Sequence, residues 1–143
     1  VVLGSAVAGL VAVWLTAATP GGAAAAHDWL PFDEASIQKR VAAGETVLVD
    51  VTADWCVTCQ WNKATVLDRD PVAGLLAGDV TPMQADWTRP DPVIADYLAK
   101  FGRYGIPFNV VYGPGAPEGE TLPELLSTDA VLAAVKKAQA SAD

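Results

Sequence analysis

The pattern of hydrophobic and polar positions separates an apolar first segment from a region of mixed helical and strand patterns. Residues 1–19 contain no charged side chain, and Ser5, Thr16 and Thr19 are their only hydroxyl-bearing residues. Because about twenty apolar residues cross the hydrocarbon core of a bilayer, this segment predicts one transmembrane helix. A linker follows over residues 20–32, and its first part is rich in Gly and Ala with one Pro. Residues 33–143 then make up the predicted folded domain.

A cleaved signal peptide is the alternative for residues 1–19, because small residues follow the apolar stretch at positions 23–26. The segment lacks the basic start of a signal peptide, and the sequence does not begin with Met. We therefore interpret the chain as the C-terminal part of a longer membrane protein. The first basic residues after the segment are Lys39 and Arg40, so no positive cluster holds this flank in the cytoplasm. We expect the domain to face outward.

Residues 33–143 alternate between helical and strand patterns. Capping residues, four-residue apolar spacing and terminal breakers predict helices at Asp33–Ala43, Cys56–Leu67, Pro92–Phe101 and Asp129–Ala140. Runs of β-branched and apolar residues predict strands at Thr46–Val51, Val80–Ala85 and Phe108–Tyr112, with an edge strand at about Thr121–Leu125. Pro82 weakens the second of these strands, because proline cannot donate to a sheet. The alternation predicts an α/β domain.

The only two cysteines, Cys56 and Cys59, lie where the strand at Thr46–Val51 gives way to a helix. At this spacing they form a dithiol that can cycle between reduced and disulfide forms. Unpaired N–H groups and the positive dipole end at the helix start favour a thiolate at Cys56. Cys59, one turn further on, can attack a mixed disulfide formed at Cys56. The motif therefore predicts thiol-disulfide exchange, with Cys56 as the exposed nucleophile and Cys59 as the resolving cysteine.

Three other uses of the cysteine pair stay open. A structural zinc site needs four ligands, whereas the chain offers two cysteines and one distant histidine, His27, which we expect to be solvated. A purely structural disulfide would close a short loop and so constrain the unfolded chain little. Two thiolates can also select a soft metal such as Cu(I), which would make the chain a non-enzymatic copper-binding or docking module.

The order of elements around the C-x-x-C motif is that of a thioredoxin-like three-layer sandwich. Ile106 and Pro107 support this fold, because a proline just before a strand can hold a cis peptide bond and cannot donate to the sheet. A cis bond would place the Ile106 backbone beside the cysteines, where an extended segment of a partner could pair with it. An ordinary trans proline at the strand entry is the alternative.

Asp50 is a carboxylate within an otherwise apolar strand, and its burial is costly unless it is protonated or partnered. A nearby cation or water that satisfies the carboxylate is the alternative to a functional role. Trp55 is expected to shield the dithiol and to shape a docking surface for substrate. Trp61 and Trp87 are expected to be packing residues.

The formal net charge of -8 at pH 7 argues against nucleic acid or an anionic membrane surface as a partner. Both of these partners need basic patches on the protein. The two cysteines can carry electrons themselves, so we expect no bound cofactor and no metal.

Four stretches of the sequence resemble the C-terminal, thioredoxin-like domain of the DsbD family of thiol:disulfide interchange proteins. They are residues 49–59, 86–88, 102–107 and 111–114, so the resemblance covers nearly all of residues 33–140. The apolar first segment looks like the end of that family's last transmembrane helix. The resemblance implies a protein-disulfide reductase of the bacterial inner membrane. Its periplasmic domain would take electrons from an upstream membrane domain and pass them to periplasmic partner proteins.

The same resemblance implies roles for single residues. Cys56 would attack and Cys59 would resolve, and Asp50 matches an acidic residue that tunes the thiol pKa in the family. Lys63 departs from the family, because many relatives have Glu at this position. A cation there would favour the thiolate and an ionised Asp50. The copper-tolerance protein ScsB has a similar C-terminal domain, and it stays open as the alternative.

Overall fold

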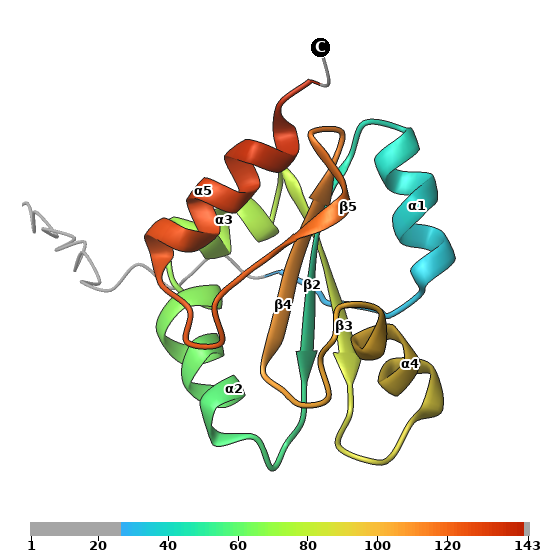
Figure 1. The fold of residues 1–143 in the computed structure, drawn as a ribbon. Helices are drawn as coiled ribbons and strands as arrows, with labels where there is room; N and C mark the ends of the chain where they lie inside the picture. Colours follow the sequence, from blue (N-terminus) through green and yellow to red (C-terminus); the bar gives the residue numbers. More distant parts are fainter. Residues whose placement is uncertain (1–26, 142–143) are drawn as a thin grey trace, which may run out of the picture.

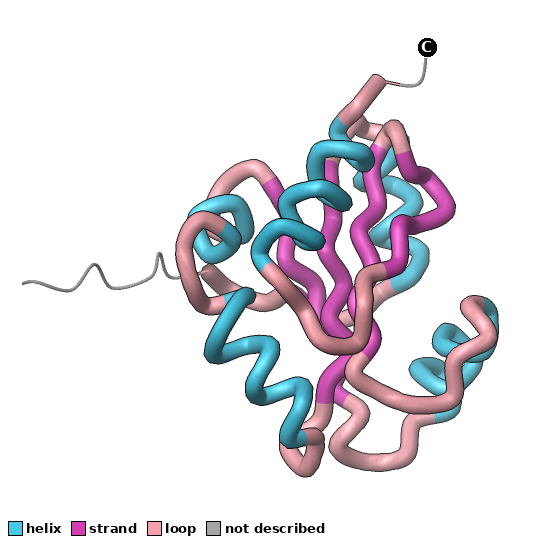
Figure 2. Tube along the Cα trace, turned by 60° about the vertical axis from the view of Figure 1, so that its left-hand side comes forward, coloured by secondary structure: helices cyan, strands magenta, loops and turns pink. Residues whose placement is uncertain are grey.

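The structure, a computed structural model, describes residues 27–141 and arranges them around a mixed five-stranded sheet in the order β1-β3-β2-β4-β5. The strands are β1 (Leu30–Pro31), β2 (Thr46–Thr52), β3 (Val80–Asp86), β4 (Phe108–Gly113) and β5 (Ala116–Thr121). The helices are α1 (Glu34–Ala42), α2 (Val57–Asn62), the π-helix η1 (Lys63–Leu67), α3 (Val72–Leu76), α4 (Pro92–Lys100) and α5 (Thr128–Gln139). Helices cover both faces of the sheet (Figure 1), and the turned view shows the same layers (Figure 2). The predicted three-layer α/β arrangement is confirmed.

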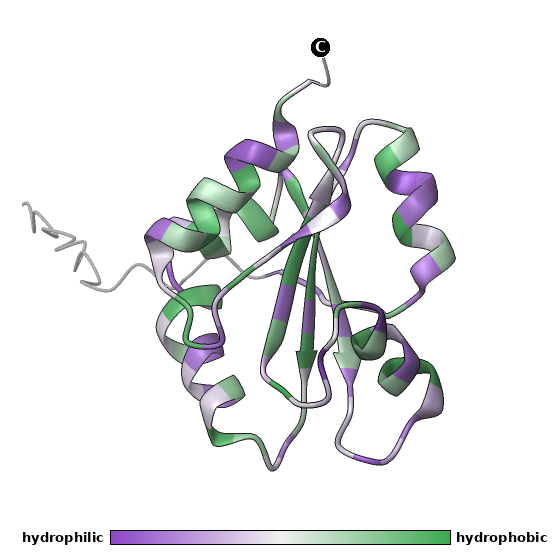
Figure 3. Cartoon of the chain, in the orientation of Figure 1, coloured by the Kyte–Doolittle hydropathy of each residue, from purple (hydrophilic) through white to green (hydrophobic). Residues whose placement is uncertain are grey.

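Each face of the sheet carries its own hydrophobic cluster. Side chains of α1 and α4 pack on one face, together with the valines of β2. Side chains of η1, α3 and α5 pack on the other face, where β2 contributes Leu48. Because side chains alternate along a strand, Asp50 shares the face of Leu48 and lies on the η1 side of the sheet. β2 and β4 are apolar over most of their length in Figure 3, as expected for strands that are covered on both faces.

The strand register places three polar residues side by side across the sheet. β3 runs parallel to β2, and β4 runs antiparallel to it. In this register Asp50 of β2 lies opposite Gln84 of β3 and opposite Asn109 of β4. Residues directly opposite each other share one face of a sheet. The three side chains therefore meet on the face that α2 and η1 cover.

Pro82, which weakened the prediction of β3, lies where its missing N–H removes no bond between β2 and β3. The Gln84 carbonyl accepts from the N–H of Phe32, so Gln84 presents its backbone groups to the β1 side. Residues two apart point the same way, and Pro82 therefore also faces that side. The pairing of β1 with β3 covers only Met83 and Gln84, so the Pro82 nitrogen lies beyond it.

Several local predictions differ from the structure. The helix predicted at Cys56–Leu67 begins at Val57 and changes to the π-helix η1 over its last turn. The helix α3 was not predicted, and β1 lies within the stretch interpreted as a linker. The edge strand runs from Ala116 to Thr121 and not from Thr121 to Leu125. Leu122, within the predicted strand, and Leu126, just after it, instead fill the hydrophobic cluster beneath α5.

The predicted transmembrane helix at residues 1–19 lies outside the described residues. Within residues 27–141, none of the helices is long and apolar enough to cross a membrane.

Candidate active site

Cys56 and Cys59 are joined by a disulfide, with their Cα atoms 5.2 Å apart. Cys56 is the N-cap residue of α2, and its Sγ accepts the backbone N–H of Cys59 at 3.2 Å. Three residues separate Cys56 from the end of β2, and its extended backbone allows the helix to start at the next residue. In the reduced form this N–H group and the helix dipole would favour a thiolate at Cys56.

The structure corrects the expectation that Cys56 is exposed. In the disulfide form Cys56 is 6 % exposed and Cys59 is 3 % exposed, so burial hardly distinguishes the two sulfurs. Ala53 and Ile106 pack against the pair and cover it. The different environments of the two cysteines come from the helix start, where Cys56 caps α2 and Cys59 lies within it.

Ile106 and Pro107 lie where the sequence analysis expected them. The peptide bond between them is cis. Ile106 packs against the cluster formed by Ala53 and the two cysteines. The loop before β4 therefore borders the disulfide. Pairing of this backbone with a partner's segment stays a prediction.

An apolar groove of about 570 Å³ opens beside the disulfide. Neither cysteine lines the groove, but Trp55 and Gly105, the residues before Cys56 and Ile106, do. The other walls include Trp87, Pro90, Pro92, Ala95 and Tyr104. Trp55 is 60 % exposed and is held in place because its Nε1 donates to the Thr88 carbonyl at 3.2 Å. The sequence analysis missed Tyr104, although it quoted the segment 102–107 that contains this residue. The groove gives the predicted docking surface at Trp55 a definite shape.

The two other tryptophans of this region behave differently. Trp87 packs partly buried against the hydrophobic cluster on the α4 side, which confirms it as a packing residue. Trp61 is 61 % exposed, so the expectation that it packs in the core is wrong. On α2 the buried positions are Cys59 and Asn62, and Trp61 falls between them on the outer face.

Asp50 is 4 % exposed and is held by two amide side chains. Asn109 Nδ2 donates to Asp50 Oδ1 at 2.7 Å, and Gln84 Nε2 donates to Oδ2 at 3.4 Å. Burial raises the pKa of Asp50 above its ordinary value of 3.8, and these two hydrogen bonds offset part of that rise. The sequence analysis missed both amides. Each is a polar residue in an otherwise apolar strand, as Asp50 is, and this signal could have found them.

Two charged side chains act on Asp50 from a greater distance. The positive charge of Lys63 lowers the pKa of Asp50, and the negative charge of Asp68 raises it. Lys63 is the first residue of η1, and its Nζ lies 6.0 Å from the centre of the Trp29 ring. Lys63 is half-buried, with its ammonium group near Trp29, and does not extend freely into solvent.

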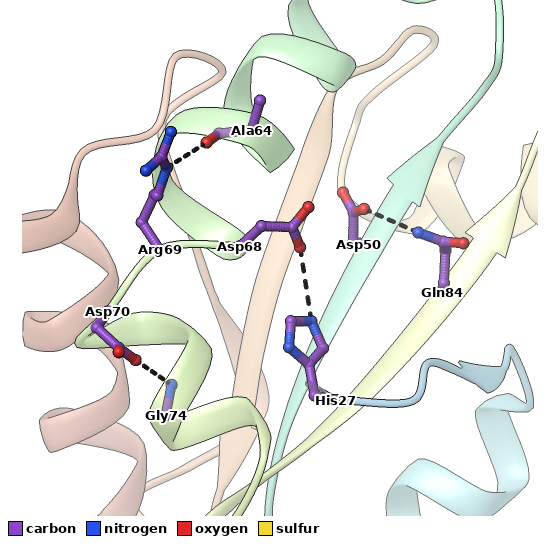
Figure 4. Close-up of polar contacts among 8 residues, drawn as sticks. All are labelled: His27, Asp50, Ala64, Asp68, Arg69, Asp70, Gly74 and Gln84. Atoms are coloured by element: carbon purple, nitrogen blue, oxygen red, sulfur yellow. Dashed lines mark hydrogen bonds and ion pairs between the residues drawn. The ribbon is translucent and has the colours of Figure 1, made fainter. Parts of the chain in front are cut away.

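His27 is the clearest departure from the sequence analysis at this site. Its side chain was expected to be solvated, but it is only 5 % exposed. The ring meets Trp29 edge to face, with centroids 5.2 Å apart. His27 Nε2 lies 3.9 Å from Asp68 Oδ1, and Figure 4 shows Asp68 and Asp50 in the same region. The cause is the short strand β1, which draws the preceding residues onto the domain.

Comparisons with known proteins agree with this geometry. The family model described as thioredoxin-like matches residues 28–114, which is more than half of the chain. Thiol:disulfide interchange protein DsbD 1 of Pseudomonas aeruginosa is 28 % identical over 97 residues, which are 68 % of this chain and 16 % of that protein. The chain therefore spans about a sixth of the length of this curated relative.

Solved structures show the same fold at low sequence identity. The oxidised C-terminal domain of DsbD from Neisseria meningitidis has a TM-score of 0.61 and 20 % identity, over 78 % of this chain and 99 % of that one. A thioredoxin from Thermus thermophilus has a TM-score of 0.58 and 22 % identity, over 78 % and 85 % of the two chains. Together with the Cys56–Cys59 disulfide, these findings support thiol:disulfide oxidoreductase activity. The chain belongs to the thioredoxin-like family.

Proposed function

We propose that this chain is the outward-facing end of an electron relay and works as a protein-disulfide reductase. The observation that carries the proposal is the disulfide at the start of α2, which packs against Ile106 and follows Trp55, a wall of the apolar groove. Thiol-disulfide exchange needs a reactive sulfur, a second sulfur within reach and a surface that receives the substrate. The Cys56–Cys59 pair and the Trp55 groove supply these parts.

The reaction begins with the reduced dithiol. The Cys56 thiolate attacks one sulfur of a partner's disulfide, that S–S bond breaks, and the partner's other sulfur leaves as a thiolate that takes up a proton. Cys59 then loses its proton and attacks the Cys56 sulfur of the mixed disulfide. The partner's remaining sulfur leaves and is protonated, so the partner gains two electrons and two protons while Cys56 and Cys59 become a disulfide. Asp50 is buried on the face of the sheet that α2 and η1 cover, and it is the proposed acceptor of the Cys59 proton.

A dithiol reductant must return two electrons to the Cys56–Cys59 disulfide before the next turnover. The likeness to DsbD 1 supports an upstream membrane domain of the same protein as this reductant, with periplasmic disulfide-bonded proteins as the final acceptors. The two cysteines carry the electrons in this scheme, and no bound cofactor takes part. A Cys59→Ala variant tests the function, because it should trap a partner on Cys56 as a covalent adduct. A copper-binding or docking module would form no such adduct.

The tether is a separate part of the proposal. Residues 1–19 are proposed to anchor the chain in the bacterial inner membrane with the domain in the periplasm, since their length and apolarity match a bilayer. We expect alkaline carbonate extraction of cells that express the full-length gene to leave the protein in the membrane pellet. Soluble mature protein that begins near residue 26 would instead identify residues 1–19 as a signal peptide.

Lys63 is proposed to tune the dithiol through its positive charge. A cation near the site favours both the thiolate and an ionised Asp50, whereas Glu would oppose both. In a Lys63→Glu variant we expect the reduced protein to be alkylated at Cys56 about two- to fivefold more slowly at pH 7. The measurement is the alkylation rate as a function of pH. Lys136→Glu on the exposed face of α5 makes the same change in net charge and should leave the rate unchanged. Equal rate profiles for the parent and Lys63→Glu would make Lys63 a surface residue only.

A further inference from the structure

The His27 imidazole is a buried titratable group that the exchange reaction does not use. Within residues 27–141, the buried side-chain nitrogen and oxygen atoms without a hydrogen-bond partner are His27 Nδ1, His27 Nε2 and Asn109 Oδ1. Asn109 is the residue that donates to Asp50. The unsatisfied polar atoms of this part of the chain therefore belong to the region around Asp50. Buried polar groups are otherwise hydrogen-bonded in most folded proteins, so this grouping points to a role.

The segment that contains His27 contacts both charged side chains that act on Asp50. His27 Nε2 approaches Asp68 Oδ1 at 3.9 Å, and the Trp29 ring lies 6.0 Å from Lys63 Nζ. The carboxylate of Asp68 is 44 % exposed, whereas the imidazole is nearly covered. A proton on His27 would thus place a positive charge on the inner side of Asp68.

Arg69 and Asp70, the charged residues next to Asp68 in the chain, do not pair with His27. Arg69 Nε donates to the Ala64 carbonyl at 3.1 Å, and Asp70 accepts the N–H of Gly74 at 3.1 Å, so both point away from the ring (Figure 4). On the same segment as His27, Asp28 is exposed. The groups that face this region are therefore Asp68 from the turn after η1, Lys63 from η1, and Asp50 from β2 with its partner Gln84 from β3.

We propose that His27 is a positioning residue of the redox site, which pairs with Asp68 when protonated and so cancels the field of that carboxylate at Asp50. The inference rests on the proposed function, because the proton affinity of Asp50 matters for exchange at Cys59. Histidine is the side chain whose charge normally changes between about pH 5 and 8. When it is protonated, His27 helps Asp50 to stay ionised. The dithiol thereby keeps a working proton acceptor in mildly acidic surroundings.

The decisive measurement is the titration of the Asp50 carboxyl by ¹³C NMR in the full 143-residue chain, reduced and kept in mild detergent. The Asp50→Asn variant assigns the signal. At pH 6 we expect His27→Gln to raise the ratio of protonated to ionised Asp50 about three- to tenfold, which is half a pH unit to one unit in the midpoint. Asp68→Asn should leave the ratio within about twofold of the parent's, because it removes the carboxylate whose field the His27 proton cancels. In the Asp68→Asn background, His27→Gln should change it by less than about twofold, because the pair acts as one unit.

Asp28→Asn is the matched control, since it removes one carboxylate from the same segment at an exposed position and should leave the Asp50 midpoint in place. If His27→Gln does not fold, His27→Asn carries the test, because it also replaces the imidazole with a neutral amide while Asp68 stays in place. An Asp50 midpoint that removal of the His27 imidazole does not move would overturn the proposal. The titration needs no partner protein, so it is independent of adduct trapping by Cys59→Ala. A shifted Asp50 midpoint without adducts would contradict the reductase function and leave the coupling of His27 to Asp50 established.

Discussion

A Cys59→Ala variant should accumulate covalent adducts with partner proteins that a reducing agent releases. In the parent, Cys59 lies in the first turn of α2 and attacks the mixed disulfide at Cys56 within the same molecule. Without Cys59, release depends on free thiols from solution at millimolar concentration. A well-placed intramolecular group has an effective concentration of molar or more, so we expect adduct release to slow by about a thousandfold or more. Non-reducing electrophoresis of extracts, with and without dithiothreitol, measures the adducts.

The control for this experiment is Cys56→Ala, which should form no adducts because the attacking sulfur is missing. The double variant should behave like Cys56→Ala. Burial does not make the assignment, since the two sulfurs are almost equally covered in the disulfide form. The assignment of the attacking role to Cys56 depends on the helix start, where Cys56 Sγ accepts a backbone N–H. Adducts that accumulate in Cys56→Ala and not in Cys59→Ala would show that the two roles are reversed.

An Asp50→Asn variant should be more stable than the parent at pH 7 by about 1 to 3 kcal/mol. Burial raises the pKa of Asp50 above its ordinary value of 3.8. Between about pH 4 and that raised pKa, the folded chain holds a proton that the unfolded chain has lost, so stability falls as the pH rises through this window. Asn cannot ionise and removes this loss. Urea unfolding at several pH values measures the free energy of unfolding for both proteins.

The same variant should be a poor reductase. If Asp50 accepts the Cys59 proton, the Asn variant should resolve the mixed disulfide at least about tenfold more slowly than the parent. General bases usually contribute about a hundredfold or more. Stopped-flow measurement of disulfide formation between Cys56 and Cys59 would give this rate. An Asn variant that is less stable than the parent at pH 7, or that resolves mixed disulfides at the parental rate, would contradict the assignment.

Asp86 offers a matched comparison at the exposed end of β3. The hydroxyl and the N–H of Thr88 both donate to its carboxylate and lower the pKa of Asp86. Its contribution to stability therefore has the opposite sign, because it is present above about pH 4 and is lost as the pH falls through the lowered pKa. Asp86→Asn should therefore lower the free energy of unfolding at pH 7, whereas Asp50→Asn should raise it.

The local sequence was sufficient for most of the elements that hold the site. Asp33 and Asp91 cap α1 and α4 by accepting N–H groups of the first turn, and such caps depend only on residues two or three positions apart. The run of β-branched residues in β2 and the C-x-x-C motif after it are equally local. The sequence therefore predicted the dithiol at a strand-to-helix junction and the buried carboxylate before it.

Features that depend on long-range packing were missed or misplaced. β5 starts directly after the turn because the chain passes against α5 there, and a Cβ on Gly115 would lie 2.2 Å from the Lys137 carbonyl. An edge strand was predicted at about Thr121–Leu125, but Leu122 and Leu126 pack beneath α5 from a loop. An apolar pattern reports that side chains are buried and leaves the backbone conformation open when the segment is short.

The sequence by itself determined the chemistry of this protein, since the two sulfurs and their spacing fix what the site can do. Only the tertiary structure decided the surroundings of that chemistry. The register of three strands brought Gln84 and Asn109 to Asp50, and a one-residue slip would have turned Gln84 or Asn109 to the opposite face. The pairing of β1 likewise drew His27 out of an expected linker and onto Asp68. Such contacts join residues far apart in the chain, so they follow from the packing of the whole domain and not from any local pattern.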